Sequence, residues 1–321
     1  MVFYRHQYLK SKTLVYNELV RIIGRNLTDR IRGLFVTPFK VFMNREALND
    51  LREVLTYYEH SSIKDYTAKQ LINEYLFSLV FPPKKRLETL SFQYKFLHKR
   101  LTSQQRSMMI ERGALCWRKD FEDCSHSIVM KIPQKYECEG CLSLSYAVDD
   151  KEIYLIAFTI CPGSDFGFND QFVILVSRIQ GTKGRHEDIS KAAKQLIDIF
   201  PSSALMSALE GLCLTLDINK VIGISAKNQV SFIDKDHRPA ISQYDDFWKT
   251  FEADTLNVSG DYLITVPFGF KSLEHIRSKF RKRTLAKRSE KSSISKITQT
   301  NCTILFSSPS LGTSIAQTVA A

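Results

Sequence analysis

A glycine-containing segment between an apolar run and an amphipathic run is the first place where residue types indicate chemistry. It reads QGTKGRH and follows the apolar stretch FVILVSRI. A turn that enters a helix directs backbone N–H groups and the positive end of the helix dipole at one point, which favours phosphate binding. The spacing matches neither G-x-x-x-x-G-K-[ST] nor G-x-G-x-x-G, so a plain strand-to-helix turn is the alternative. The residues expected to contact a phosphorylated cofactor are Gln180, Gly181, Lys183, Gly184, Arg185 and His186.

Two acidic segments can supply a general base. Glu139 precedes Gly140 immediately before a predicted strand, where an exposed carboxylate can accept a proton. A Glu-Gly pair is also typical of a solvated turn, which is the alternative. Asp245 and Asp246 follow Tyr244 at the expected start of a helix, where acidic residues usually cap the helix or compensate its dipole.

Cysteine spacing does not predict a metal centre. Seven cysteines without regular spacing differ from a secreted disulfide framework, so we expect reduced thiols. Cys138 and Cys141 form one C-x-x-C, with Cys116, Cys124 and His126 upstream. A second ligand pair with short, regular spacing is missing, and we therefore expect no metal.

The strongest charge feature is the segment RSKFRKRTLAKR, residues 277–288, in a chain of net charge +11. We expect it to bind a polyanion such as RNA, DNA or an anionic lipid surface. Helical spacing spreads its charges around the axis, and only Phe280 and Leu285 are apolar, so contact with a phosphate backbone fits better than deep membrane insertion. A solvated helix end is the alternative. The basic residues are Arg277, Lys279, Arg281, Lys282, Arg283, Lys287 and Arg288.

Hydrophobic periodicity indicates the elements that position these groups. Residues 12 to about 115 show helical spacing, with prolines at 82 and 83 ending one helix. From residue 126, HSIVMKI, LSLSYAV, IYLIAFTIC and FVILVSRI read as consecutive strands joined by turns, which predicts an antiparallel meander. Beyond them the chain alternates: two amphipathic helices, a buried strand KVIGIS, a short helix QYDDFWKTF and a last strand DYLITVPF.

Length and composition bound the architecture. The 321 residues are ordinary in hydrophobic and charged content, and no apolar run is long enough to span a bilayer, so we expect a cytoplasmic globular protein. We predict an α/β (α+β) fold with a mixed, largely antiparallel sheet. The predicted parts are a helical N-terminal region (1–120), an α/β core (121–289) and a poorly ordered tail rich in Ser and Thr (290–321).

The order of the core elements resembles that of the GNAT acetyltransferases. In that fold, the loop after the fourth strand binds the coenzyme A pyrophosphate, which would be Gln180 to Arg185 here, and a tyrosine protonates the leaving thiolate. The resemblance makes Tyr244 the candidate acid. Arg178, Gly181 and Thr182 only approximate the usual Q/R-x-x-G-x-G/A motif. If the strands ending at Ile179 and beginning at Val221 separate and leave a cleft at the loop, the transferase interpretation is favoured.

Residues 30 to 290 also resemble the VirK/YbjX family of enterobacterial virulence-associated proteins. The motifs QYKFLHKRL, EGCLSLSY, SRIQGTKG, INKVIGIS, YDDFWKTF and IRSKFRKR occur in the family's order. The resemblance implies an accessory role in virulence or stress and no established reaction. Cys141 replaces a more usual acidic residue, and AKNQVSF lacks a frequent histidine. Two functions therefore stay open: a GNAT-like acyltransferase, and a non-catalytic protein that binds a polyanion.

Overall fold

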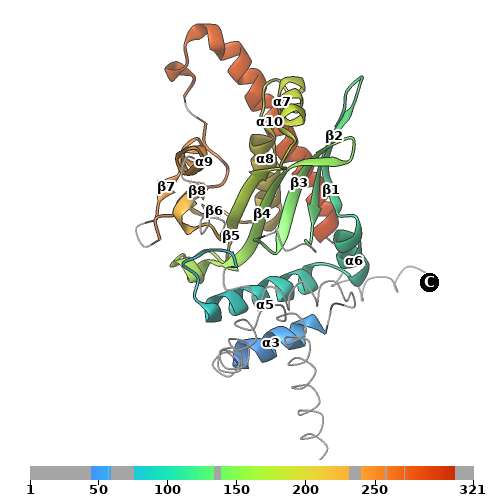
Figure 1. Cartoon of the computed structure of the whole chain (residues 1–321), viewed down its shortest axis with the longest axis vertical. Helices are drawn as coiled ribbons and strands as arrows, with labels where there is room; N and C mark the ends of the chain where they lie inside the picture. The colour runs from blue at the N-terminus through green and yellow to red at the C-terminus, as the bar shows by residue number, and fades with distance from the viewer. Residues whose placement is uncertain are drawn as a thin grey trace, which may run out of the picture. The chain divides into compact units, whose positions relative to one another are not determined.

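A computed structural model describes residues 45–56, 58, 76–133, 139–230, 240–256, 259–270 and 272–307 (Figure 1). The chain divides into two compact units. The first combines Met1–Glu74 with Pro82–Ser91, and the second combines Tyr75–Phe81 with Phe92–Ala321. The first unit contains the amphipathic helix α3 (Arg45–Leu55), which buries Leu51 and Val54. The helical N-terminal region is therefore confirmed.

The second unit is built on an eight-stranded sheet of order β1-β2-β3-β4-β5-β6-β8-β7. The strands are β1 (Ala114–Asp120), β2 (Ser125–Lys131), β3 (Leu142–Val148), β4 (Lys151–Pro162), β5 (Phe172–Gly181), β6 (Lys220–Gly223), β7 (Asp254–Thr255) and β8 (Tyr262–Thr265). All neighbouring strands are antiparallel except β5 and β6, which are parallel. The predicted mixed, largely antiparallel α/β fold is confirmed, and the expected meander forms β2 to β5.

Helices flank this sheet. They are α6 (Ser103–Glu111), α7 (His186–Gln195), α8 (Pro201–Leu216), α9 (Ala240–Lys249) and α10 (Ser278–Phe306), with 3-10 turns at Gly163–Phe166, Ala226–Asn228 and Leu273–His275. The helix α5 (Pro83–Arg100) begins in the first unit and ends in the second. The crossover between the parallel strands carries α7 and α8, and α8 buries most of its residues against β3, β4 and β5. Among the described residues, no helix is both long and apolar enough to cross a bilayer.

Two expectations about the elements are wrong. The expected helical region ends before β1, an additional strand that pairs with β2 from Ala114 to Asp120. The segment expected to be a loose tail is helical as far as Phe306, because α10 runs along α8 and reaches β1 (Figure 1). Its buried residues are Ile294, Ser295, Thr298, Cys302 and Leu305. Residues 308–321 of that predicted tail lie outside the described residues.

β5 and β6 pair over only part of the length of β5. The two strands pair from Ile174–Val221 to Val176–Gly223, and one more hydrogen bond joins the Ile224 N–H to the Val176 carbonyl at 3.1 Å. β5 then continues to Gly181 beside β4, while β6 ends. Just at this point β5 carries a bulge, since its pairing with β4 skips Ser177. The pairing of β5 with β6 therefore ends before β5 reaches the glycine turn.

Candidate active site

Arg178 follows the bulge in β5 and marks the centre of the site. Its guanidinium lies 3.6 Å from the Glu139 carboxylate and donates to the Gln180 side chain from Nε at 2.6 Å. Glu139 reaches this position because Gly140 crosses directly over β4. A Cβ atom on Gly140 would lie only 2.6 Å from the Phe158 backbone nitrogen. The glycine is thus required for the close approach that brings Glu139 from the head of β3 towards β5.

The Glu139 carboxylate is buried, and its neighbours balance its negative charge only in part. Only 8% of the residue is exposed, so the solvated turn considered from the sequence is wrong. Its Oε2 atom is buried and makes no hydrogen bond within the described residues. Burial raises the pKa of Glu139 to about 7, and the nearby charge of Arg178 opposes that rise. A carboxylate with a pKa close to neutral is suited to accept and return a proton.

Tyr244, on α9, presents a second buried group to the same place. Its hydroxyl is buried and makes no hydrogen bond with any residue that the structure describes. The pKa of Tyr244 is raised mainly by burial and next by the negative charge of Glu139. The two residues predicted to be catalytic therefore lie close enough for the charge of Glu139 to act on Tyr244.

Packing against β6 fixes the position of α9. The Trp248 indole donates to the Ile224 carbonyl at 3.0 Å, and its ring fills the space next to Gly223, where a Cβ atom would lie 2.5 Å away. Asp245 accepts a hydrogen bond from the Ala226 N–H at 2.8 Å. The expected capping role of Asp245 and Asp246 is wrong, because α9 begins at Ala240 and both residues lie in its second half.

Cys141 lies next to this site in the chain but is not suited to react. It is fully buried, and burial raises the pKa of its thiol to about 12. The thiolate, which is the nucleophilic form, is therefore scarce at neutral pH. The described residues contain no group of three His, Cys, Asp or Glu side chains placed to hold a metal ion. Proton transfer through Glu139 and Tyr244 is the chemistry that this arrangement supports.

The glycine turn follows three residues after Arg178. Gly181 ends β5 between Tyr154 and Ile189, whose atoms would lie 3.2 and 2.9 Å from an added Cβ, so this glycine serves packing. Gly184 adopts φ +79° and has open space around it. Lys183 and His186 are exposed, and α7 begins at His186.

The first turn of α7 carries its own negative charge. Glu187 and Asp188 lie there, and Arg185 pairs with Asp188 at 3.1 Å. These carboxylates compensate the helix dipole and would compete with a bound phosphate. Lys183 and Gly184 are therefore the positions of the turn most accessible to an anion.

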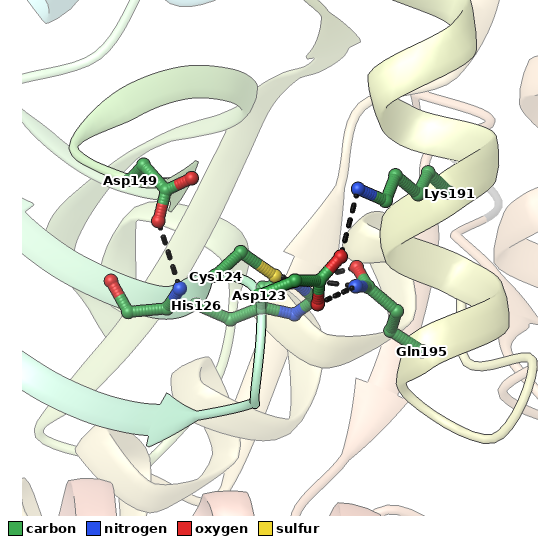
Figure 2. A network of polar contacts seen from close by, with 7 residues as sticks. Asp123, Cys124, His126, Asp149, Lys191 and Gln195 are labelled. Carbon is green, nitrogen blue, oxygen red and sulfur yellow. Dashed lines mark hydrogen bonds and ion pairs between the residues drawn. The ribbon is translucent and has the colours of Figure 1, made fainter.

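A hydrogen-bonded network around His126 was not expected from the sequence (Figure 2). The buried imidazole accepts or donates at both nitrogens: Nδ1 is 2.7 Å from the Tyr146 hydroxyl, and Nε2 is 3.1 Å from Gln195 Oε1 and 3.5 Å from Cys124 Sγ. Gln195 donates onward to Asp123 at 3.0 Å. Burial lowers the pKa of His126 and raises that of Cys124, so both groups are neutral at physiological pH. The network therefore ties α7 to β2 as a structural connection.

The basic segment forms the first turns of α10, not a solvated helix end that leads into a loose tail. Arg283 pairs with Asp198, and Lys287 donates to the Asp198 carbonyl at 2.8 Å. Arg281 donates to the Ile276 carbonyl at 2.9 Å. Arg288 lies 5.1 Å from the centre of the Phe270 ring. The remaining basic residues, Arg277, Lys279 and Lys282, are exposed and form no ion pair within the described part of the chain.

Comparison with known proteins gives one match. Residues 40–289 match a family model described as a protein of unknown function, DUF535. No curated protein and no solved structure matches. The matched region includes Glu139, Arg178, Tyr244 and the whole basic segment. Since the family model covers more than half of the sequence, the chain belongs to the DUF535 family.

Proposed function

We propose that this protein is a GNAT-like acyltransferase in which Glu139 is the general base and Tyr244 the general acid. The observation that carries the proposal is that the two side chains lie close enough for the charge of Glu139 to act on Tyr244, and that each has a buried oxygen without a hydrogen bond among the described residues. Within the DUF535 family, we place the chain with the VirK/YbjX proteins, as a cytoplasmic accessory protein in virulence or stress. This placement rests on the order of the motifs between residues 30 and 290.

The proposed reaction moves an acyl group from a thioester to an amine. As the amine nitrogen attacks the carbonyl carbon, Glu139 accepts its proton and a C–N bond forms. The C–S bond then breaks, and the Tyr244 hydroxyl gives its proton to the leaving thiolate. Proton transfer from Glu139 to Tyr244, directly or through water, restores both groups. The products are an amide and a free thiol.

The part of β5 beyond its pairing with β6 suits the extended arm of a coenzyme A thioester. β6 pairs with β5 as far as Val176, and β5 continues from there to the glycine turn. Gly181 lies three positions after Arg178, about 10 Å along a strand. A ligand that follows this edge would reach Lys183 and Gly184, whose charge and open backbone favour a phosphate group.

Turnover tests this proposal. The protein is incubated with acyl-coenzyme A thioesters and a panel of amines, and the release of free thiol is followed. We expect Glu139→Gln to lower kcat/KM by about a hundredfold or more, as for removal of a general base. Because the base must be ionised, kcat/KM of the wild type should rise with pH through about 7. Glu152→Gln, an exposed carboxylate on β4, is the matched control and should leave the rate unchanged.

Two results would contradict the proposal. One is that no thioester is cleaved and no coenzyme A derivative raises the melting temperature. The other is that Glu139→Gln and Glu152→Gln react at the same rate. In either case Glu139 does not act as a base in acyl transfer.

Polyanion binding by the basic segment is a second candidate function. The first turn of α10 contains no acidic residue, and Arg277, Lys279 and Arg281 lie at this helix end, where the dipole is already positive. Cations are unfavourable at this position, so the stability of the helix does not account for them. RNA, DNA and an anionic lipid surface each carry phosphate that would compensate the charge.

A further inference from the structure

Exposed apolar side chains gather around the basic segment. The described residues contain ten exposed large hydrophobic side chains, and five of these lie on the segment or beside residues that it contacts. Two belong to the segment, one lies beneath Arg288, and two flank Asp198, which binds Arg283 and Lys287. The five residues, with their exposed fractions, are Ile197 (39%), Phe200 (58%), Phe270 (49%), Phe280 (45%) and Leu285 (50%). We call them, with the basic segment, the apolar–basic surface.

Folding does not explain the two apolar residues of the α7–α8 connection. Ile197 has a φ of +53°, a left-handed conformation that is strained for a β-branched residue. Phe200 is the N-cap residue of α8 and forms no side-chain cap, although Ser, Thr, Asp or Asn stabilises this position. The contacts of Arg283 and Lys287 with Asp198 hold this strained connection against α10.

Positive charge is crowded on the same surface. The pKa of Lys287 is lowered, first by burial and then by the neighbouring Arg283. The one carboxylate that pairs with the segment among the described residues belongs to Asp198. A partner with dense negative charge would relieve this repulsion, and a partner that also accepts apolar side chains would bury the five hydrophobic residues.

We propose that the apolar–basic surface docks on membranes that contain anionic phospholipids. Lys and Arg would bind the lipid phosphates, while Ile197, Phe200 and the apolar residues of α10 enter the boundary between headgroups and acyl chains. Nucleic acid fits less well, because aliphatic side chains such as Ile197 and Leu285 cannot stack on bases as aromatic rings do. This docking extends the second candidate function and is independent of acyl transfer.

Vesicle flotation tests the docking. The full chain is mixed with vesicles of phosphatidylcholine alone or of equal parts phosphatidylcholine and phosphatidylglycerol, and we expect binding only to the second kind. Combined replacement of Arg277, Lys279 and Lys282 by Ala should weaken vesicle binding by about a hundredfold. Each basic residue near an anionic surface increases the affinity about fivefold. These three residues are chosen because they are exposed and outside the ion pairs of α10.

A second variant separates the apolar contribution from charge and from folding. Ile197→Asn combined with Phe200→Ser keeps every charge, relieves the left-handed strain and supplies an N-cap to α8, so the fold should be as stable or more stable. We expect this variant to lose vesicle binding by about tenfold or more. Glu139→Gln should bind vesicles as the wild type does, so failure of acyl transfer and failure of docking can be told apart.

Three results would overturn the docking. The first is that the wild type does not float with the anionic vesicles. The second is that the variant with changes at Ile197 and Phe200 floats as well as the wild type. The third is that the protein binds short RNA or DNA more tightly than anionic vesicles and that the Ile197 and Phe200 changes do not affect this binding. That outcome would assign the surface to nucleic acid.

Discussion

Glu139 is subject to two opposing effects. Burial disfavours its charged form, while Arg178, 3.6 Å away, favours it. Desolvation is the larger effect, because the ion pair is long and one carboxylate oxygen makes no hydrogen bond within the described residues. A short, fully hydrogen-bonded ion pair would have lowered the pKa instead. This imbalance keeps Glu139 able to change its protonation state near neutral pH.

Replacing Tyr244 by Phe removes a hydroxyl that forms no hydrogen bond among the described residues while keeping the ring that packs on Trp248 at 5.9 Å. We therefore expect the free energy of unfolding to change by less than about 1 kcal/mol, or to rise. Thiol release should fall by about a hundredfold, as for loss of a general acid. Urea unfolding measured beside turnover would show this separation. A loss of several kcal/mol with unchanged turnover would make Tyr244 a structural residue.

At the scale of the elements, the contact of β6 with α9 sets the position of Tyr244. Gly223→Ala would place a methyl group against the Trp248 ring, within 2.5 Å, and displace α9. We expect a loss of about 1–3 kcal/mol in the free energy of unfolding and reduced turnover. Gly269→Ala is the matched control, because its Cβ would meet only the mobile end of Glu252 at 3.0 Å. Equal stability of the two variants in thermal unfolding would contradict the close packing of α9 on β6.

The second half of α10 is held by close packing against α8. A Cβ atom on Gly211 would lie 2.2 Å from the Ser295 carbonyl oxygen, so Gly211→Ala must push the helices apart. We expect a loss of about 1–3 kcal/mol in stability and faster amide hydrogen exchange over residues 294–305. Wild-type exchange in this segment should be slow. Rapid exchange in the wild type itself would show that α10 does not dock there.

Sequence patterns predicted the elements with strong periodicity. The apolar stripe expected from Ile189 to Phe200 forms α7 only as far as Gln195, and the four apolar runs from residue 126 form β2 to β5. β1 was missed because its alternation includes the exposed Leu115 and follows a helical region. The C-terminal half of α10 was missed because three of its five buried residues, Ser295, Thr298 and Cys302, are small or polar. Their spacing, at 294, 298, 302 and 305, nevertheless repeats a helical stripe and was the available signal.

For the candidate site, the sequence indicated the residue types but not their burial. The residue types of Glu139 and Tyr244 suggested acid and base chemistry, but nothing in their neighbouring sequence indicates that both are buried. Their burial depends on Gly140 crossing β4 and on Trp248 packing against Gly223, contacts between segments far apart in the chain. Tertiary packing of this kind decides pKa values and is not contained in local patterns.

At the scale of the whole molecule, the basic residues and the candidate active site lie on different elements. The basic residues of α10 account for much of the net charge of +11, whereas the buried site lies between β3, β5 and α9. A change in one is therefore expected to leave the other intact. The stability of the whole chain reports on the site directly, because Glu139 binds its proton more tightly in the folded protein than in the unfolded chain.

The most direct test is the free energy of unfolding of the wild type and of Glu139→Gln, measured by urea denaturation between pH 4.5 and pH 8. Folding raises the pKa of Glu139 from 4.5 to about 7, so the folded state holds more protons in this window and loses stability as the pH rises. The variant lacks this loss. We predict that its stability relative to the wild type increases with pH by up to about 3 kcal/mol and levels off above about 7. A difference that is constant with pH, or a variant that becomes less stable than the wild type as the pH rises, would show that Glu139 forms a stabilising ion pair with Arg178 and is not a poised base.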